Sequence, residues 1–483
     1  MYFARFPCDS RACPGFFILV PARIFLGATL SLMKTKHNTT AAFNREFRNW
    51  RVWATRAIVV ATACVAGMAV VAFTWLGEQA LDQFMALFYF RWWAALIWTP
   101  LCTAAIVWLT RRHFSAAAGS GIPQVMAALD PLAPASATGK LVSFRLSLAK
   151  VALTTGGLLA GLSLGREGPS VQVAAGVMLT ARKWLPERSS ISTHGLLVAG
   201  GAAGIAAAFN TPLAGVMFAI EELSRTPEQR SSGLLMSAIV LAGLMAVSVY
   251  GNATYFGIIH ATGIDLTLLL PGLLVAVLSG LTGGVFSRLL QASLGGHGRD
   301  VLSRLRRDRP VLFAALCGLL VAVIGVVSAG TTFGSGYTHT RDMLAGREAV
   351  PALFLLLKFV ATWLTTWSGV PAGIFAPSLA IGAALGNDVA VLLHSHQGTA
   401  LIALGMVGFL AAATQAPLTS FIIVMEMVDG HAMVLSLMAC AMVARTVSNV
   451  ISAPLYSVLA QQQLAGLVAA DTPRLGTNAG TPA

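Results

Sequence analysis

The stretch Gly165-Arg166-Glu167-Gly168-Pro169 places one carboxylate between two glycines, in the middle of a long apolar part of the chain. A charged side chain at membrane depth is costly, and such residues are rare unless they line an ion path or relay protons. Two interpretations of Glu167 are open: a gate on an ion path, or a structural salt bridge with Arg166. The cost of an intramembrane carboxylate favours the gate.

A second copy of this frame follows 208 residues later (373 − 165 = 208), as Gly373-Ile374-Phe375-Ala376-Pro377. Both copies have the spacing Gly-x-x-x-Pro and continue with serine, but only the first carries a charge. Two halves built on one plan are a common transporter architecture, with the binding site where the repeats meet. Further matches occur at an offset of 205: Ala206–Ala208 with Ala411–Ala413, Pro212 with Pro417, and Glu221 with Glu426.

The composition defines the class of protein. Hydrophobic residues make up 56% of the 483 residues, charged residues only 11%, and the mean hydropathy is +0.75. A soluble core within a polar surface does not have this composition, so we predict an all-α multi-pass membrane protein. Segments near both Gly-x-x-x-Pro frames are shorter or broken, which favours half-helices over ordinary kinked helices. Runs close to the length needed to span are 57–76, 92–109, 234–250, 268–286 and 311–329.

The repeat also predicts how the chain is divided. Either Met1 or Met33 is the true start, and no cleaved signal peptide is expected. The predicted parts are an N-terminal extension at 1–42, a first membrane repeat at 43–261, a second membrane repeat at 262–460 and a short cytoplasmic tail at 461–483.

The net charge of +13 does not indicate nucleic-acid binding, because the basic residues form short clusters between apolar segments. By the positive-inside bias these clusters are cytoplasmic, and the loop expected around Glu78 and Asp82 lies outside. The basic residues at 182–188 do not fit an assignment to either side of the membrane. The clusters are Arg45, Arg48, Arg51 and Arg56, then Arg111 and Arg112, then Arg225 and Arg230, and finally the stretch 299–309.

The cysteines show no pairing pattern and lie mostly within apolar segments, so we expect packing residues, with neither a disulfide framework nor a metal site. They are Cys8, Cys13, Cys64, Cys102, Cys317 and Cys440.

Four motifs in order give the chain a family resemblance: Gly-Ser-Gly-Ile-Pro at 119–123, the two frames at 165–169 and 373–377, and a late Tyr456. This order resembles the ClC family of chloride channels and chloride/proton exchangers. The resemblance implies an inverted repeat of about eighteen helical segments and a homodimer with one pore per subunit. It also implies a bacterial inner-membrane protein with both termini cytoplasmic, no cofactor and no enzymatic activity. Chloride and protons are then the substrates.

The resemblance assigns an anion site to these motifs. Glycines and prolines let helices start beside the ion, so that free amides and positive helix ends face an anion without a fixed cation, whose full charge would bind too tightly. The Glu167 carboxylate then competes for the outer position. Serine at position 120, rather than proline, resembles the chloride-preferring members. Considered alone, each residue favours a structural role, Ser120 as a helix cap and Tyr456 as an interfacial anchor. The chloride-binding groups implied are Ser120, Ile374, Phe375, Tyr456 and Gly168.

The proton path depends on Glu221 and Glu222. Adjacent helical residues point about 100° apart, so one enters the protein while the other faces water. The resemblance selects Glu222 as the internal proton carrier and leaves Glu221 to the solvent; the alternative is a helix end with two solvated acids. Lys150 matches the buried lysine of exchangers. Gln124 and Met126 depart from some exchangers, which carry carboxylates there.

Three functions are compared. The presence of both Glu167 and Glu222 favours a chloride/proton antiporter over a passive chloride channel, which would keep the same pore. An intramembrane serine hydrolase would use Ser120 as nucleophile and need a histidine base, with His113 and His194 as candidates. The Ile-Pro pair after Ser120 fits an ion site better.

Overall fold

The structure is a computed structural model that describes residues 50–134, 136–186, 189, 191–224, 232–251, 254–257, 266–295, 300–347 and 353–471. The chain divides into the units Met1–Ala54 and Thr55–Ala483, and all contacts below lie within the second unit. The described residues contain eight helices long and apolar enough to cross a membrane. The all-α multi-pass character predicted from composition is therefore confirmed.

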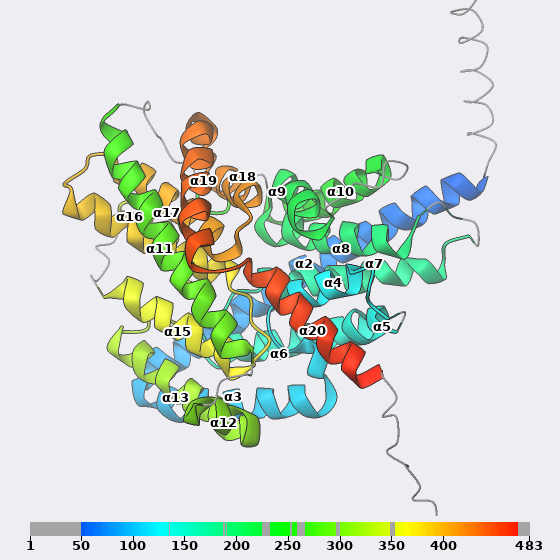
Figure 1. Ribbon diagram of the computed structural model, residues 1–483, viewed down its shortest axis with the longest axis horizontal. Helices are drawn as coiled ribbons and strands as arrows, with labels where there is room; N and C mark the ends of the chain where they lie inside the picture. The colour runs from blue at the N-terminus through cyan, green and yellow to red at the C-terminus, as the bar shows by residue number, and fades with distance from the viewer. Residues whose placement is uncertain are drawn as a thin grey trace, which may run out of the picture. The chain divides into compact units, whose positions relative to one another are not determined.

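Helices account for nearly all of both halves (Figure 1). The first half contains α2 (Trp50–Phe90), α3 (Ala95–His113), α4 (Ile122–Leu129), α5 (Ala137–Leu141), α6 (Phe144–Leu159), α7 (Glu167–Leu179), α8 (Thr193–Phe209), α9 (Pro212–Phe218) and α10 (Ser232–Tyr250). The second contains α11 (Leu269–Leu294), α12 (Val301–Asp308), α13 (Pro310–Val327), α14 (Tyr337–Leu344), α15 (Phe354–Ser368), α16 (Phe375–Leu392), α17 (Gly398–Thr414), α18 (Pro417–Met427), α19 (Val434–Ile451) and α20 (Leu455–Asp471).

Both Gly-x-x-x-Pro frames interrupt helices, as the sequence predicts. The first lies between α6 and α7 and the second between α15 and α16. Pro169 and Pro377 each stand third in the new helix, where a missing N–H leaves no intrahelical bond unmade. The short apolar helices α8, α15, α17 and α18 complete the expected pattern of incomplete spans.

The matches at an offset of 205 also have structural counterparts. Helices α8 and α17 both end at a residue in the left-handed conformation, Asn210 with φ 58° and Gln415 with φ 63°. Such a residue ends a helix by turning the chain. Pro212 and Pro417 then begin α9 and α18. The two halves therefore repeat their turns as well as their helices.

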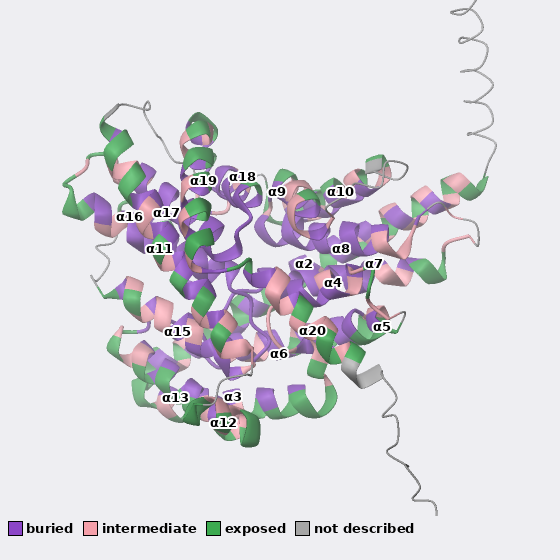
Figure 2. Cartoon of the chain, viewed as in Figure 1, coloured by how far each residue is buried: buried purple, intermediate pink, exposed green. Residues whose placement is uncertain are grey.

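The centre of the fold is formed by α7 against α8 and by α16 against α17. These helices are buried along most of their length, whereas α12 and the outer faces of α3 and α13 are exposed (Figure 2). Small residues allow close contact: a Cβ at Gly204 would lie 2.6 Å from the Ser170 carbonyl oxygen.

One local expectation was wrong. Glu78 and Asp82 lie within the long helix α2, not in a loop. The sequence around them is apolar enough for the helix to continue past two acids. Several predicted features lie outside the described residues, namely the boundary at 262, Met1 and Met33, Cys8 and Cys13, and Arg45, Arg48, Arg188, Arg225, Arg230 and Arg299.

Candidate anion and proton path

The two frames meet through their backbones. The Gly165 amide donates to the Gly373 carbonyl oxygen at 2.8 Å, and the Gly373 amide donates back to Gly165 at 2.9 Å. The Ala372 amide donates to the Gly119 carbonyl oxygen at 3.2 Å. A Cβ at Gly168 would collide with the Ser120 hydroxyl, so glycine is needed for this approach. The motifs at 119, 165 and 373 therefore form one junction.

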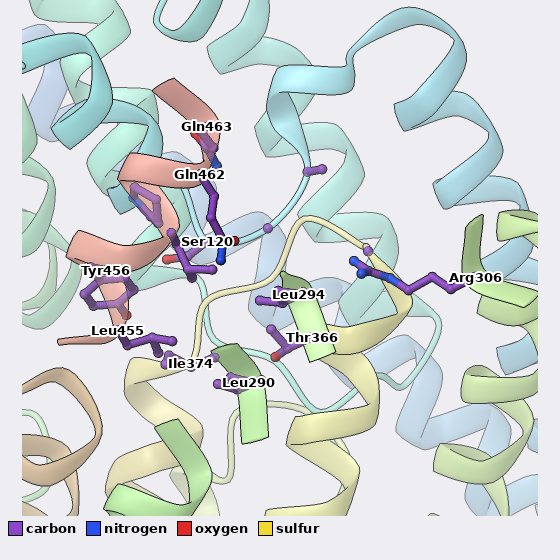
Figure 3. Close-up of a pocket in the computed structure, with 15 residues that line it drawn as sticks. Ser120, Leu290, Leu294, Arg306, Thr366, Ile374, Leu455, Tyr456, Gln462 and Gln463 are labelled. Atoms are coloured by element: carbon purple, nitrogen blue, oxygen red, sulfur yellow. The ribbon is translucent and has the colours of Figure 1, made fainter. Parts of the chain in front are cut away.

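Four helices begin close to this junction: α4, α7, α16 and α20. A cavity of about 270 Å³ is lined there by Ser120, Ile374 and Tyr456. Figure 3 shows these three residues gathered at the cavity from three separate segments of the chain. Helix amino-terminal ends carry free amides and partial positive charge, which favour an anion. The sequence-predicted groups are thus brought together.

The hydroxyls of Ser120 and Tyr456 both line the cavity. Each oxygen is buried and makes no hydrogen bond of standard geometry within the described part of the chain. Buried polar atoms normally have partners, so two such hydroxyls at one cavity indicate a site for a ligand.

Aromatic rings surround the start of α16. The rings of Phe375 and Tyr456 stack with centroids 6.0 Å apart, and Phe218 meets Phe375 edge-on at 6.5 Å. Phe209 also contacts Phe375, at 6.3 Å. Sequence reasoning missed Phe209 and Phe218, because single aromatic residues in apolar helices carry no distinguishing pattern. Phe218 ends α9, which continues into the turn that contains Glu222, so its ring connects that segment to the start of α16.

The Glu167 carboxylate is fully buried. Its Oε2 accepts a hydrogen bond from the Ala376 amide at 3.4 Å, at the start of α16, and its Oε1 has no partner among the described residues. A first-repeat side chain thus occupies the amino-terminal end of a second-repeat helix.

Arg166 does not take the alternative role of a partner for Glu167. Its guanidinium donates to the Glu78 carboxylate at 2.7 Å and to the Thr74 carbonyl oxygen at 2.8 Å. The ion pair thus joins the first frame to α2, and Glu167 is left with backbone amides.

Lys150 is buried and holds the segment before Ser120. Its Nζ donates to the carbonyl oxygens of Ala117 at 2.8 Å and Gly119 at 2.6 Å. Gln124 donates to the intervening Ala118 at 2.5 Å, and Gln172 to Ala116 at 3.2 Å. Four successive carbonyl groups are thus bound by side chains. Gln124, where some exchangers carry a carboxylate, has this backbone role, and Met126 is half-buried beside the core.

A second buried lysine repeats this arrangement. Lys358 follows Lys150 by 208 residues (358 − 150 = 208), the same offset as the two frames. Its Nζ donates to the Thr332 and Gly334 carbonyl oxygens, at 2.9 and 2.8 Å. Gly-Ser-Gly at 334–336 repeats the Gly-Ser-Gly at 119–121. Sequence reasoning missed this pair, although the offset would have revealed it.

The acidic pair ends the span that begins at α9, in a π-helical turn over Ala219–Leu223. The prediction that Glu221 faces the solvent was wrong. Its carboxylate accepts from the Leu418 and Thr419 amides at 3.1 and 2.6 Å, and so caps α18. The wide π-helical turn brings Glu221 against the neighbouring helix, whereas the prediction assumed regular α-helical spacing. Glu222 is half-buried.

The cap is reciprocal. Glu426, at the end of α18, accepts from the Leu213 and Ala214 amides at 3.2 and 2.8 Å and so caps α9. The match of Glu221 with Glu426 at an offset of 205 therefore reflects two helices that cap each other across the repeats.

Comparisons with known proteins agree with this geometry. The model of the voltage gated chloride channel family matches residues 102–449. The chain belongs to the ClC family. It is 31% identical over 433 residues to the H(+)/Cl(-) exchange transporter ClcA of Klebsiella pneumoniae subsp. pneumoniae, covering 85% of this chain and 88% of the relative. ClcA of Salmonella arizonae is 31% identical over 412 residues, covering 82% and 83%.

Solved ClC structures show the same fold. A slow cyanobacterial Cl-/H+ antiporter superposes with a TM-score of 0.73 at 24% identity, over 85% of this chain and 98% of that chain. A CLC-type fluoride/proton antiporter gives 0.69 at 20% identity, with the same coverage. The predicted ClC-type fold is therefore confirmed.

Membership in the ClC family makes this chain a multi-pass integral membrane transporter and not an enzyme. ClC exchangers work without a cofactor. The serine-hydrolase alternative is thereby wrong. In the structure His113 is exposed and its ring contacts Trp108 and Phe114.

Proposed function

We propose that this ClC protein is a chloride/proton antiporter gated by Glu167. One observation carries the proposal: the buried Glu167 carboxylate sits on the Ala376 amide at the start of α16, a place that also suits an anion. Protonation removes the charge that holds the side chain there. The carboxylate then leaves with a proton while chloride takes the position, which couples the two movements.

Chloride is held without a fixed cation. The hydroxyls of Ser120 and Tyr456 and the amides of Ile374 and Phe375 provide donors, and Gly168 permits the close approach of the first frame. A full positive charge in the same place would slow release, whereas helix ends and hydroxyls bind more weakly. Lys150 contributes indirectly, by binding the carbonyl groups that precede Ser120.

Protons take a separate route at the inner end. Glu222 ends the span that contains Phe218, whose ring meets that of Phe375 beside the anion cavity. We assign Glu222 as the internal proton carrier. Glu221, which caps α18, is assigned a structural role.

Orientation and assembly complete the proposal. Arg111 and Arg112 end α3 and the cationic helix α12 follows α11, so this side is assigned to the cytoplasm of a bacterial cell, together with both termini. Leu213 and Leu418, 55% and 38% exposed, lie on the packed helices α9 and α18 and form an apolar face for a second copy. We therefore assign this face to the interface of a homodimer that has one pore in each subunit.

Two alternatives share this pore. A passive chloride channel would conduct without protons, and the superposition on a fluoride/proton antiporter raises fluoride as the cargo. The test is reconstitution into liposomes with an anion gradient, a pH electrode and either anion. We expect chloride flux to drive protons the opposite way and fluoride to be poorly coupled. Chloride flux without proton movement would support the channel, and coupling to fluoride alone would support the other antiporter.

A further inference from the structure

The cavity at Ser120 and Tyr456 has a charged side chain on its wall. Among the described residues that line it, Arg306 is the one that carries a formal charge. It comes from α12, a short helix outside the candidate membrane spans. Figure 3 shows its guanidinium group directed toward the cavity, on the far side of Leu294 and Thr366 from Ser120.

The position of Arg306 is set by backbone contacts. Its Nη1 donates to the Ser293 carbonyl oxygen at 2.9 Å, at the end of α11. The Ser293 hydroxyl in turn accepts from the Trp363 indole at 2.9 Å. The guanidinium is thus fixed by a neutral acceptor, which leaves its charge uncompensated by that bond. Arg304 on the same helix is exposed and does not line the cavity.

The charge of Arg306 is permanent. Burial lowers the pKa of the guanidinium, and the neighbouring Arg111 cation lowers it further. An arginine starts so far above neutrality that it remains protonated in a folded protein. A permanent cation on the wall of a low-dielectric cavity raises the local concentration of anions.

We propose that Arg306 forms an anion-capture site at the α12 mouth of the cavity, where chloride is held before it passes to Ser120 and Tyr456. This proposal rests on the proposed chloride transport. Leu294 and Thr366 separate the cation from the central hydroxyls, so capture does not place a fixed charge at the central site. Arg306 is only partly buried, and a partly exposed charge binds an anion weakly and so releases it quickly.

A purely structural role for Arg306 makes a different prediction. If the residue only ties α12 to α11, its charge is irrelevant to transport and the bond to Ser293 is its whole function. A charge series separates the two roles. Arg306→Lys keeps the charge and loses the guanidinium geometry, Arg306→Gln removes the charge, and Arg304→Gln removes an equal charge from the exposed side of the same helix.

The measurement is tracer chloride exchange in liposomes with equal chloride on both sides, as a function of chloride concentration. We expect Arg306→Gln to raise the half-saturating concentration by roughly fivefold, the change that corresponds to losing about 1 kcal/mol at a partly exposed charge. Arg306→Lys should stay within about twofold of the wild type, and Arg304→Gln should match it. Added impermeant salt should slow the wild type more than Arg306→Gln.

Two results would overturn the proposal. One is equal half-saturation in Arg306→Gln and Arg304→Gln, and the other is a rise in Arg306→Lys as large as that in Arg306→Gln. If Arg306→Gln does not fold, Arg306→Met removes the same charge and takes its place in the comparison with Arg304→Gln. A wild type that exchanges no chloride would instead sink the proposed function, so the two failures are distinguishable.

Discussion

The two Gly-x-x-x-Pro frames have the same backbone and different chemistry. Gly165 and Gly373 exchange hydrogen bonds, and each frame starts a buried helix. At the first helical position one frame has the Glu167 carboxylate and the other the Phe375 ring. The carboxylate lies on the amino-terminal end of the opposite helix, and the ring stacks on Tyr456. Under the proposed function, the symmetric scaffold makes the ion site and the one asymmetric position provides the proton coupling.

The residues that hold the backbone around the site are more alike in the two repeats than the residues of the site itself. Lys150 and Lys358 each bind the first carbonyl group of a Gly-Ser-Gly segment and the carbonyl group two residues before it, and Glu221 and Glu426 cap each other's helices. We therefore expect the two members of each pair to contribute similar amounts to the free energy of unfolding. Transport should distinguish the members of a pair only where one lies beside the anion cavity.

The largest effect is expected at the inner end of the proton route. Glu222→Gln removes the proposed internal carrier, so proton transport should fall to background while chloride flux continues. Parallel recordings of chloride and pH in liposomes measure both. Proton coupling that survives in Glu222→Gln would remove the internal proton site from this turn.

The central hydroxyl should have the next largest effect. Tyr456→Ala removes a proposed donor to chloride and the ring that stacks on Phe375, so we expect chloride binding to weaken and fewer protons to move per chloride. Isothermal titration with chloride and the ratio of fluxes measure these changes. Wild-type affinity in Tyr456→Ala would show that its hydroxyl is outside the anion site.

Lys150 and Lys358 are expected to have similar effects on stability but different effects on chloride binding. Lys150→Met and Lys358→Met each remove the lysine donor from two carbonyl groups, which should lower stability by about 3 kcal/mol in Lys358→Met and by about 2 kcal/mol in Lys150→Met, because the Gly119 carbonyl oxygen keeps the Ala372 amide. Only Lys150→Met should also weaken chloride binding, because its carbonyl partners precede Ser120. Thermal unfolding in detergent and chloride titration provide the comparison. Equal losses of chloride affinity in both variants would contradict it.

The smallest effect is expected from the reciprocal caps. Glu221→Gln and Glu426→Gln keep an acceptor oxygen and lose the charge at a helix start, so each should cost about 0.5–1 kcal/mol of stability. Proton coupling should remain near wild type in both, which thermal unfolding and paired flux recordings can check. Uncoupling in Glu221→Gln alone would reverse the assignment within the acidic pair.

Much of this arrangement was predictable from the sequence. The frames at 165 and 373, the residues Ser120 and Tyr456, and the repeat offset led to the ClC fold and to groups that meet at one cavity. These features are carried by glycine, proline and charge, which stand out against an apolar background.

What the sequence did not predict depends on which atoms meet. The position of Glu221 depends on a π-helical turn, and regular α-helical spacing placed it in water. The repeat offset pairs Lys358 with Lys150, but the carbonyl groups that Lys358 binds are identified only by the fold. Arg306 was one of many arginines in a basic stretch, and only the fold of α12 against α11 brings it to the cavity.

The central claim, that a single carboxylate on a symmetric scaffold couples chloride to protons, is tested most directly by Glu167→Gln. Chloride efflux and proton uptake are recorded together in liposomes over a range of pH. Wild-type protein should take up protons as chloride leaves, with flux rising as the pH falls, because protonation releases the carboxylate from the Ala376 amide. In Glu167→Gln chloride flux should continue, independent of pH and without proton uptake. Proton uptake that persists in Glu167→Gln would contradict the account.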